Sequence, residues 1–258
     1  MLSERVFERG FLALRGVVAS AAPESDRVLE IPRVEIRALP HPLALLDDAA
    51  LRLALRREPA ELGSAALGAP NRGRLLNAVR LLDGPGWEVV DGARSWGTEE
   101  TIGYLEAALR GFRARFPGAP LVFVGDMSRR QGGWLRPHRS HQNGRDVDLG
   151  YLYRGGPAWY RPATRETLEL RQTWGLLLSV LSEGDVEYVF IDGGVQALLR
   201  EQAEREGYDP RWLDRLFGGF ERKTDAVVRH ARGHRTHMHV RYFAPNSSET
   251  GRRVKRLL

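Results

Sequence analysis

The chain has 258 residues, 42% of them hydrophobic, which fits one large domain or one domain with an extension and argues against wholesale disorder. Its 39 Lys and Arg residues exceed its 33 Asp and Glu residues, but the basic residues are spread along the chain without the compact run typical of a nucleic-acid-binding arm, so we expect no nucleic-acid partner. The absence of cysteine excludes disulfides, thiolate ligands for zinc and a cysteine nucleophile, so any metal must rest on histidines and carboxylates.

The first part of the chain shows no recognisable chemistry. Residues 1–24 include an apolar stretch that ends in small residues, but charged residues interrupt it, so a signal peptide is not evident. The leucine spacing over 43–55 predicts a helix, and the Gly, Pro and Asn residues of 68–87 predict a boundary or a surface loop. We therefore expect an N-terminal extension of unknown role over 1–70 and a main domain over 71–258. No segment approaches the roughly 20 apolar residues that span a bilayer.

The main domain mixes helix and strand patterns. Thr98 is expected to cap a helix with two glutamates in its first turn, which Pro117 and Gly118 end. A buried strand is predicted in PLVFVGDMS (120–128), followed by a loop rich in Gly and Arg (129–146). Further strands are predicted at 147–153, 187–192 and 236–243, helices at 168–181 and 195–206, and a turn or short helix at 208–217. The fold class is therefore α+β, with a small central antiparallel sheet flanked by helices.

The seven histidines are clustered in the sequence. His138 and His141 lie within four positions, four more lie between His230 and His239, and only His41 stands alone. Random placement would put fewer than one histidine in windows this short, so the clustering needs a physical cause. Metal binding is one such cause, because imidazole and carboxylate suit Zn²⁺, and a catalytic zinc takes three protein ligands and leaves a position for water.

Strand periodicity shows how these residues can meet. Side chains two apart on a strand point to one face, so His237 and His239 can reach one site, and Asp146 and Asp148 bear the same relation. Spacing alone does not choose between the two histidines or between the two aspartates. Separately, each pattern also fits a solvated pair of histidines on an edge strand, an exposed loop that attracts anions, or carboxylates that cap loops.

Two motifs together carry a family resemblance: HRSHQNGRDVD at 138–148 and HRTHMHVR at 234–241. They resemble the penicillin-insensitive murein endopeptidases, which belong to a wider group of zinc peptidases related to the D-alanyl-D-alanine dipeptidases and the Hedgehog signalling domain. The similarity covers roughly residues 70–245. Well-known members carry disulfide-bonded cysteines, which this chain lacks, and the stretch 153–172 offers no histidine where some members have one.

The resemblance implies roles for six residues. It assigns the zinc to His141, Asp148 and His239, and it places His237 beside the metal as the base or transition-state partner. It also places His138 and His234 in the active site.

The implied reaction is hydrolysis of the peptide cross-links of peptidoglycan, at a bond between D-alanine and diaminopimelate, in the periplasm or cell envelope. Zinc would lower the pKa of its bound water toward about 7 and polarise the carbonyl, while His237 assists proton transfer. The chain has no GxSxG or HExxH motif. The alternatives are a related zinc D,D- or L,D-carboxypeptidase and a non-catalytic cell-wall-binding module. The sequence does not indicate an oligomeric state.

The loop around the first motif is basic. Its arginines are Arg129, Arg130, Arg136, Arg139 and Arg145. Guanidinium groups grip carboxylates with two hydrogen bonds, so these side chains are candidates to hold the carboxylates of a peptidoglycan stem, although a solvated basic loop explains them equally well. Trp134 and Tyr151 are expected either to wall the cleft or to lie in the core or at its rim.

Overall fold

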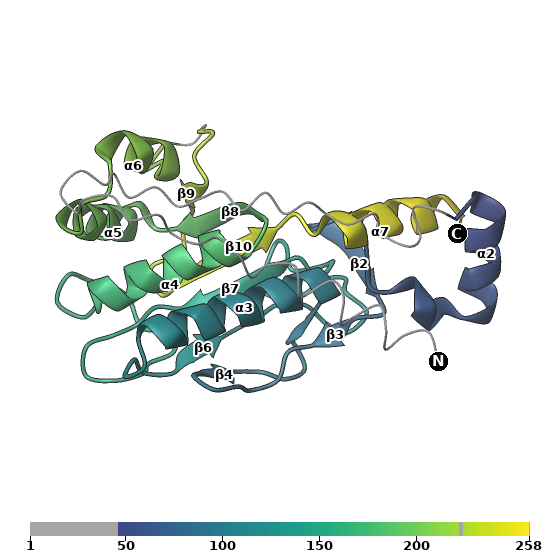
Figure 1. The fold of residues 1–258 in the computed structure, drawn as a ribbon, viewed down its shortest axis with the longest axis horizontal. Helices are drawn as coiled ribbons and strands as arrows, with labels where there is room; N and C mark the ends of the chain where they lie inside the picture. The colour runs from purple at the N-terminus through teal and green to yellow at the C-terminus, as the bar shows by residue number, and fades with distance from the viewer. Residues whose placement is uncertain (1–45, 222–223, 258) are drawn as a thin grey trace, which may run out of the picture.

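A six-stranded sheet forms the centre of the computed structural model, which describes residues 46–221 and 224–257. Figure 1 shows the strands running across the molecule in the order β4, β6, β7, β10, β8, β9. Their bounds are Trp87–Val89 for β4, Val122–Val124 for β6, Asp146–Gly150 for β7, His237–Tyr242 for β10, Val186–Ile191 for β8 and Val228–His230 for β9.

The four inner strands are antiparallel, as the sequence predicts, whereas both edge pairs are parallel. Each parallel pair is joined by a connection that contains helix: α3 (Glu99–Arg115) between β4 and β6, and α5 (Gly193–Arg205) with α6 (Pro210–Leu216) between β8 and β9. Such a crossover is what a parallel pairing requires, because a tight hairpin can join only antiparallel strands. The sheet is therefore mixed.

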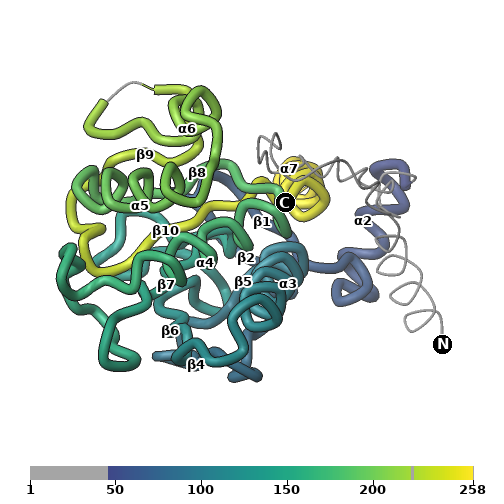
Figure 2. The backbone as a smooth tube through the Cα atoms, turned by 60° about the vertical axis from the view of Figure 1, so that its left-hand side comes forward, coloured from purple at the N-terminus to yellow at the C-terminus, as the bar shows by residue number. Residues whose placement is uncertain are grey.

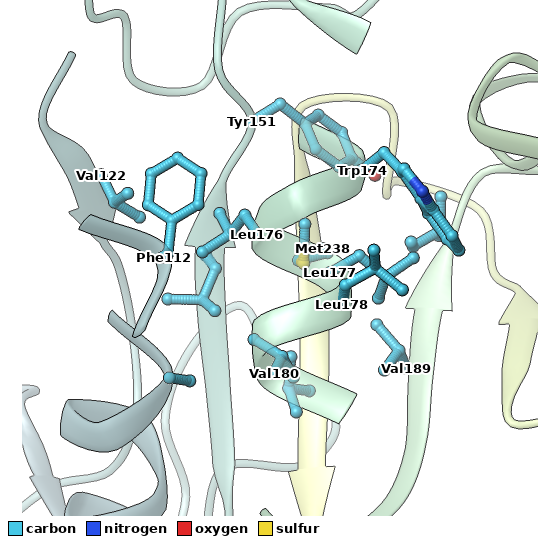
Figure 3. Close-up of a cluster of buried hydrophobic side chains, with 14 of the residues drawn as sticks. Phe112, Val122, Tyr151, Trp174, Leu176, Leu177, Leu178, Val180, Val189 and Met238 are labelled. Carbon is cyan, nitrogen blue, oxygen red and sulfur yellow. The ribbon is translucent and has the colours of Figure 1, made fainter. Parts of the chain in front are cut away.

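The two faces of the sheet differ in chemistry. Val147 and Leu149 of β7 and Met238 and Val240 of β10 are buried in the hydrophobic core, in which α3, α4 (Leu170–Glu183) and α5 take part. Figure 3 shows side chains of α4 packed in front of Met238. Since side chains alternate along a strand, the intervening Asp146, Asp148, His237 and His239 belong to the opposite face. The polar cluster thus lies on the side of the sheet that these helices leave free.

Helix α3 begins and ends where the sequence predicts. The hydroxyl oxygen of Thr98 accepts a hydrogen bond of 3.1 Å from the backbone N–H of Thr101, and Glu99 and Glu100 occupy the first turn. The predicted strands at 120–128, 147–153, 187–192 and 236–243 correspond to β6, β7, β8 and β10. The predicted helices at 168–181 and 195–206 correspond to α4 and α5, and the turn or short helix predicted at 208–217 contains α6.

The N-terminal helix is shorter than the leucine spacing indicates. Helix α2 spans Asp48–Arg57, because Asp47 caps it by accepting a hydrogen bond of 2.7 Å from the backbone N–H of Ala50. Residues 43–45 and the segment 1–24 lie outside the described residues. A short 3-10 helix, Pro59–Leu62, follows.

The segment expected to be a boundary or surface loop contains strands instead. β1 (Ala65–Ala69) and β2 (Arg72–Leu76) form a hairpin, and β3 (Val79–Arg80) pairs with β5 (Trp96–Gly97). The hairpin packs on a C-terminal helix, α7 (Pro245–Leu257), which the sequence did not indicate. Figure 2 shows α2 and α7 side by side, away from α5 and α6. The hairpin spans position 70, and the boundary near that residue stays a prediction.

A second, smaller hydrophobic cluster joins these elements. Its buried members are Leu51, Leu62, Ala65, Leu67 and Val254. Among the described residues, no helix combines the length and apolar character that crossing a membrane requires.

Candidate metal centre

Three segments bring histidines and aspartates together on the polar face of the sheet. β7 supplies Asp146 and Asp148, and β10 supplies His237 and His239. In the antiparallel register, His239 lies opposite Asp148. The loop between β6 and β7 brings His141, whose side chain is fully buried, against both strands.

The tightest part of the cluster consists of three buried ligand atoms. His141 Nε2 lies 3.0 Å from His239 Nδ1 and 3.3 Å from Asp148 Oδ1, and His239 Nδ1 lies 3.1 Å from Asp148 Oδ1. Ligands bound to a tetrahedral zinc at about 2.0–2.1 Å are themselves about 3.3 Å apart. The three atoms therefore have the mutual spacing that a single small cation would hold.

The outward nitrogens of both rings already have acceptors. His141 Nδ1 lies 2.8 Å from the carbonyl oxygen of Met127, and His239 Nε2 lies 3.1 Å from Asp146 Oδ1. Carbonyl and carboxylate oxygens only accept, so these nitrogens carry the protons of the neutral rings. The inward atoms, His141 Nε2 and His239 Nδ1, then present lone pairs. Ligating histidines in metal sites are oriented by this same type of hydrogen bond.

The buried carboxylates of Asp146 and Asp148 favour a positive charge on the group between them. Burial alone lowers the pKa of His239, but Asp146 and Asp148 outweigh it and raise that pKa to about 9. Burial opposes ionisation of Asp148 as well, yet the charges and hydrogen bonds of His141 and His239 lower the pKa of this carboxyl well below its usual range. The required charge is either a proton on His239 or a metal cation, and the nitrogen and oxygen donors fit the cation.

Asp146 positions both histidines from behind. Its Oδ2 accepts a hydrogen bond of 2.8 Å from the backbone N–H of His141, and its Oδ1 accepts one of 2.6 Å from Nε of Arg241. His141 has a φ of 65°, a left-handed conformation that is unfavourable for a residue other than glycine. The bonds to Asp146 and Met127 hold His141 in this conformation, so the ring is fixed before any ligand binds.

His138 joins the cluster more loosely. Its Nε2 lies 2.7 Å from Asp126 Oδ2, which also accepts a hydrogen bond of 2.9 Å from Arg94. Burial raises the pKa of Asp126, but the hydrogen bonds from His138 and Arg94 outweigh it and lower this pKa. The other ring nitrogen, Nδ1, lies 3.7 Å from Asp148 Oδ2. The ligand atoms of His138, His141 and Asp148 all lie within 4.8 Å of one another, so this group could also hold a metal ion.

His237 and His234 flank the other side of the cluster. His237 Nε2 lies 3.7 Å from Asp148 Oδ2, and its Nδ1 contacts the hydroxyl of Thr236 at 2.9 Å. The rings of His234 and His237 are 5.0 Å apart. Burial lowers the pKa of His237, and burial together with the neighbouring His237 and His239 lowers the pKa of His234 to about 4. Both rings are therefore neutral at neutral pH.

Two residues near the cluster, Tyr160 and Asp126, were not predicted from the sequence. The ring of Tyr160 stacks on His237, with centroids 5.5 Å apart and planes 18° from parallel. Tyr160 is 57% exposed and has a φ of 61°, and nothing in the surrounding segment indicates this position. Asp126 lies two residues after the end of strand β6, and a carboxylate just beyond a buried strand is a signal that the sequence offered.

The structure brings together the six residues that the resemblance names. The other candidate residues around the site lie in the core, form structural contacts or are exposed. Tyr151 is buried, and its hydroxyl donates to the carbonyl of His234 at 2.9 Å, so it belongs to the core. Arg145 bonds Glu187 and the carbonyl of Tyr242, which makes it structural. The remaining loop arginines are exposed, and Trp134 is 57% exposed.

Comparison with known proteins identifies a protein family. A family model described as penicillin-insensitive murein endopeptidase matches residues 66–256. The match covers most of the chain and includes both histidine motifs and every residue of the cluster. A comparison with the curated proteins finds no match.

Proposed function

This chain belongs to the penicillin-insensitive murein endopeptidase family, and from this premise we propose that it is a zinc enzyme that cleaves the D-alanyl-diaminopimelate bonds of peptidoglycan cross-links. The family comprises metallopeptidases that act on murein, which indicates a location in the cell envelope. We place the protein in the periplasm, where such cross-links are accessible.

The observation that carries this proposal is the set of three ligand atoms with a spacing of 3.0 to 3.3 Å. We assign the metal to His141 Nε2, Asp148 Oδ1 and His239 Nδ1. His138 is the weaker candidate, because its Nε2 is engaged by Asp126 at 2.7 Å and its Nδ1 is 3.7 Å from the nearest oxygen of Asp148. Zinc is the metal that fits best, since two neutral imidazoles and one carboxylate are ligands it takes in catalytic sites.

His237 is the residue that we expect to move the proton. A zinc ion bound at these ligands supplies a Lewis acid that lowers the pKa of water to about 7 and polarises a carbonyl group. His237 is neutral, its Nδ1 contacts Thr236, and its Nε2 faces the second oxygen of Asp148. Nε2 can therefore accept a proton from the attacking water and return it to the leaving amine.

His138 and His234 complete the site on its two sides. The chain of hydrogen bonds from Arg94 through Asp126 fixes the ring of His138, so this ring is held in place without substrate. His234 is neutral, and it can accept a hydrogen bond from an amide N–H of the peptide. We assign both residues to substrate positioning or to assistance in catalysis.

The test is hydrolysis of defined cross-linked muropeptide dimers by the purified protein, with and without a chelator, followed by mass spectrometry. We expect monomers as products, loss of activity with chelator, loss of zinc in His141→Ala, and retention of zinc without activity in His237→Ala. Release of terminal D-alanine from monomers would show a carboxypeptidase instead. Binding without any product would show a cell-wall-binding module.

A further inference from the structure

A concave site lies next to the loop that carries His138 and His141. This hollow, which we call the hairpin pocket, has a volume of about 390 Å³ and lies between the β1–β2 hairpin, the loop and the end of α7. The lining side chains that carry the argument are Arg72 and Arg74 of β2, Trp134 of the loop and Lys255 of α7.

The pocket is positively charged. Arg72, Arg74 and Lys255 are exposed, and no acidic residue lines the pocket. Within residues 46–221 and 224–257, none of these three cations forms an ion pair. Three uncompensated cations around one hollow attract an anionic group, and two guanidinium groups hold a carboxylate particularly well.

Glycines shape the pocket wall. Gly133 has a φ of 80°, and a Cβ atom built on it would lie 2.0 Å from Nη1 of Arg74. The guanidinium of Arg74 therefore packs directly over the backbone of the loop. A Cβ atom on Gly73 would lie 2.6 Å from two carbonyl oxygens of its own hairpin, so this position also admits only glycine. The backbone of the hairpin and of the loop therefore forms part of the pocket wall.

Trp134 gives the pocket an apolar wall. The side chain is 57% exposed, although tryptophan is the largest apolar surface a residue can bury. An exposed aromatic face beside polar groups suits a ligand that is itself flat and apolar on its faces and polar at its edges. A pyranose ring has this character, because its C–H groups lie on the faces and its hydroxyl and acetamido groups lie at the edge.

The hairpin pocket and the metal centre share one loop. The backbone N–H of Gly133 donates to the carbonyl oxygen of Gln142 at 2.9 Å, and the N–H of Gln142 donates to Pro70 of the hairpin at 3.0 Å. These bonds bring Trp134 and Gln142 to the pocket, while His138 and His141 between them join the metal centre. A substrate with a sugar at one end and a peptide at the other can therefore contact both sides of this loop.

We propose that the hairpin pocket binds the muramyl end of the substrate, with the sugar ring on Trp134 and the first free carboxylate of the attached stem between Arg72, Arg74 and Lys255. This inference rests on the proposed function, because the peptide stems of a cross-link are attached to muramyl sugars. The lactyl carboxylate of the sugar is consumed in the amide bond to the first residue of the stem. The first free carboxylate is therefore the one on the α-carbon of the second residue, a γ-linked D-glutamate.

The first test is binding, measured by calorimetry on the full-length protein with probes that contain no cross-link to cleave. The probes are N-acetylmuramyl-L-alanyl-D-glutamate and N-acetylmuramyl-L-alanyl-D-isoglutamine, which share the sugar and the peptide and differ in carrying a carboxylate or an amide on the α-carbon of the second residue. We expect the probe with the carboxylate to bind at least tenfold more tightly. Trp134→Ala should weaken binding of both probes, and the double variant Arg72→Gln/Arg74→Gln should remove the difference between them.

Arg211→Gln is the matched control, because it removes an exposed arginine from α6, which does not line the pocket. Equal binding of the two probes, or an unchanged preference in the double arginine variant, would overturn the proposal. So would tighter binding of inorganic polyphosphate than of the carboxylate probe, since the pocket would then be a site for phosphate polyanions.

The second test separates this inference from the proposed function. Kinetics are compared on cross-linked dimers that retain their sugars and on the same dimers without sugars. For Trp134→Ala, we expect KM to rise severalfold on the sugar-bearing dimer only, with kcat unchanged. Hydrolysis with identical KM on both substrates in the wild-type protein would overturn the pocket and leave the peptidase. Sugar binding without any hydrolysis would overturn the peptidase and leave the pocket.

Discussion

Asp146 Oδ1 lies 3.1 Å from Nε2 of His239, while Oδ1 of Asp148 lies 3.1 Å from Nδ1 of the same ring. The two aspartates are two positions apart on one strand, so they reach the two nitrogens of one imidazole from a single face of the sheet. One carboxylate therefore contacts the nitrogen that we propose as a metal ligand, and the other fixes the ring from behind. This division explains why both aspartates of the DVD segment are buried.

The first prediction concerns these two aspartates. Asp148→Asn should abolish stable zinc binding, because it removes a ligand. Asp146→Asn keeps all three ligands and removes only the orienting carboxylate, so zinc affinity should fall by about 10- to 100-fold. Competition with a chromogenic chelator measures both. Equal affinities in the two variants would contradict the assignment.

Asp146→Asn also affects stability, since it leaves the partly buried Arg241 without its carboxylate partner. Breaking a fully buried ion pair costs about 3–5 kcal/mol, and the partial exposure of Arg241 makes the cost here smaller. Circular dichroism at the temperature of the binding assay must therefore show a folded variant. Asp91→Asn, in an exposed ion pair with Arg94, is the matched control and should change neither zinc affinity nor stability measurably.

The second prediction concerns pH. In the metal-free protein the pKa of His239 is raised to about 9, because Asp146 and Asp148 outweigh the effect of burial, so the ring is protonated at neutral pH. Zinc must displace this proton. From this ring alone, affinity should therefore rise by about tenfold per unit of pH below pH 9. Calorimetry in two buffers of different ionisation enthalpy should show more than one proton released per zinc at pH 7.5, because the zinc-bound water, with its pKa lowered to about 7, loses a proton in addition to His239.

A zinc affinity that is constant between pH 6.5 and 8.5 would contradict this account. The Asp146→Asn variant provides a control, because removing one carboxylate lowers the pKa of His239. Proton release at pH 7.5 should then be smaller than in the wild-type protein.

Local sequence patterns were enough to predict the segments that form the candidate metal centre. Thr98 with two following glutamates predicts the start of α3, and the alternation in HMH places two histidines on one face of β10. The choice of ligand nitrogen, in contrast, depends on which acceptors lie behind each ring. For His141 this acceptor is the carbonyl of Met127, fourteen residues away, and spacing in the sequence does not reveal it.

Strand β1 and helix α7 escaped prediction for another reason. The hairpin segment is rich in Gly, Pro and Asn, which locally favour turns. Its strands are stabilised by contact with α7, whose residues lie about 180 positions later in the chain. Secondary-structure propensity depends only on residues that are close in the sequence. Stabilising tertiary contacts of this kind therefore produce strands where the propensity favours turns.

The third prediction concerns Tyr160, which stacks on His237. Such a ring contact contributes about 0.5–1.5 kcal/mol, and tenfold in rate corresponds to about 1.4 kcal/mol. Tyr160→Ala frees the ring of His237 to leave its position, so kcat should fall by roughly three- to tenfold. Zinc content should stay unchanged. Tyr160→Phe keeps the ring and should retain wild-type kcat, whereas a wild-type kcat in Tyr160→Ala would show that the stacking does not position His237.

The last prediction concerns the contact between α7 and the hairpin, on which the shape of the hairpin pocket depends. A Cβ atom on Gly251 of α7 would lie 2.0 Å from the carbonyl oxygen of Ala66, so helix and strand must separate to admit it. Glycine to alanine inside a helix otherwise stabilises by up to about 1 kcal/mol. Because the clash is with backbone, it should outweigh this gain, and Gly251→Ala should lower the free energy of unfolding by about 1–3 kcal/mol.

Gly111 of α3 is the matched control, because a Cβ atom there meets only the flexible side chain of Glu183, at 3.7 Å. Gly111→Ala should therefore raise the free energy of unfolding, by up to about 1 kcal/mol. Urea unfolding of the two variants, compared with wild type, measures both effects. Both changes add the same methyl group to a helix, but only at Gly251 does a backbone atom occupy the place of that group. We therefore expect the free energy of unfolding to fall in Gly251→Ala and to rise in Gly111→Ala. If Gly251→Ala were as stable as Gly111→Ala, α7 would not pack against β1 at this distance, and Lys255 would lose its place beside Arg72 and Arg74.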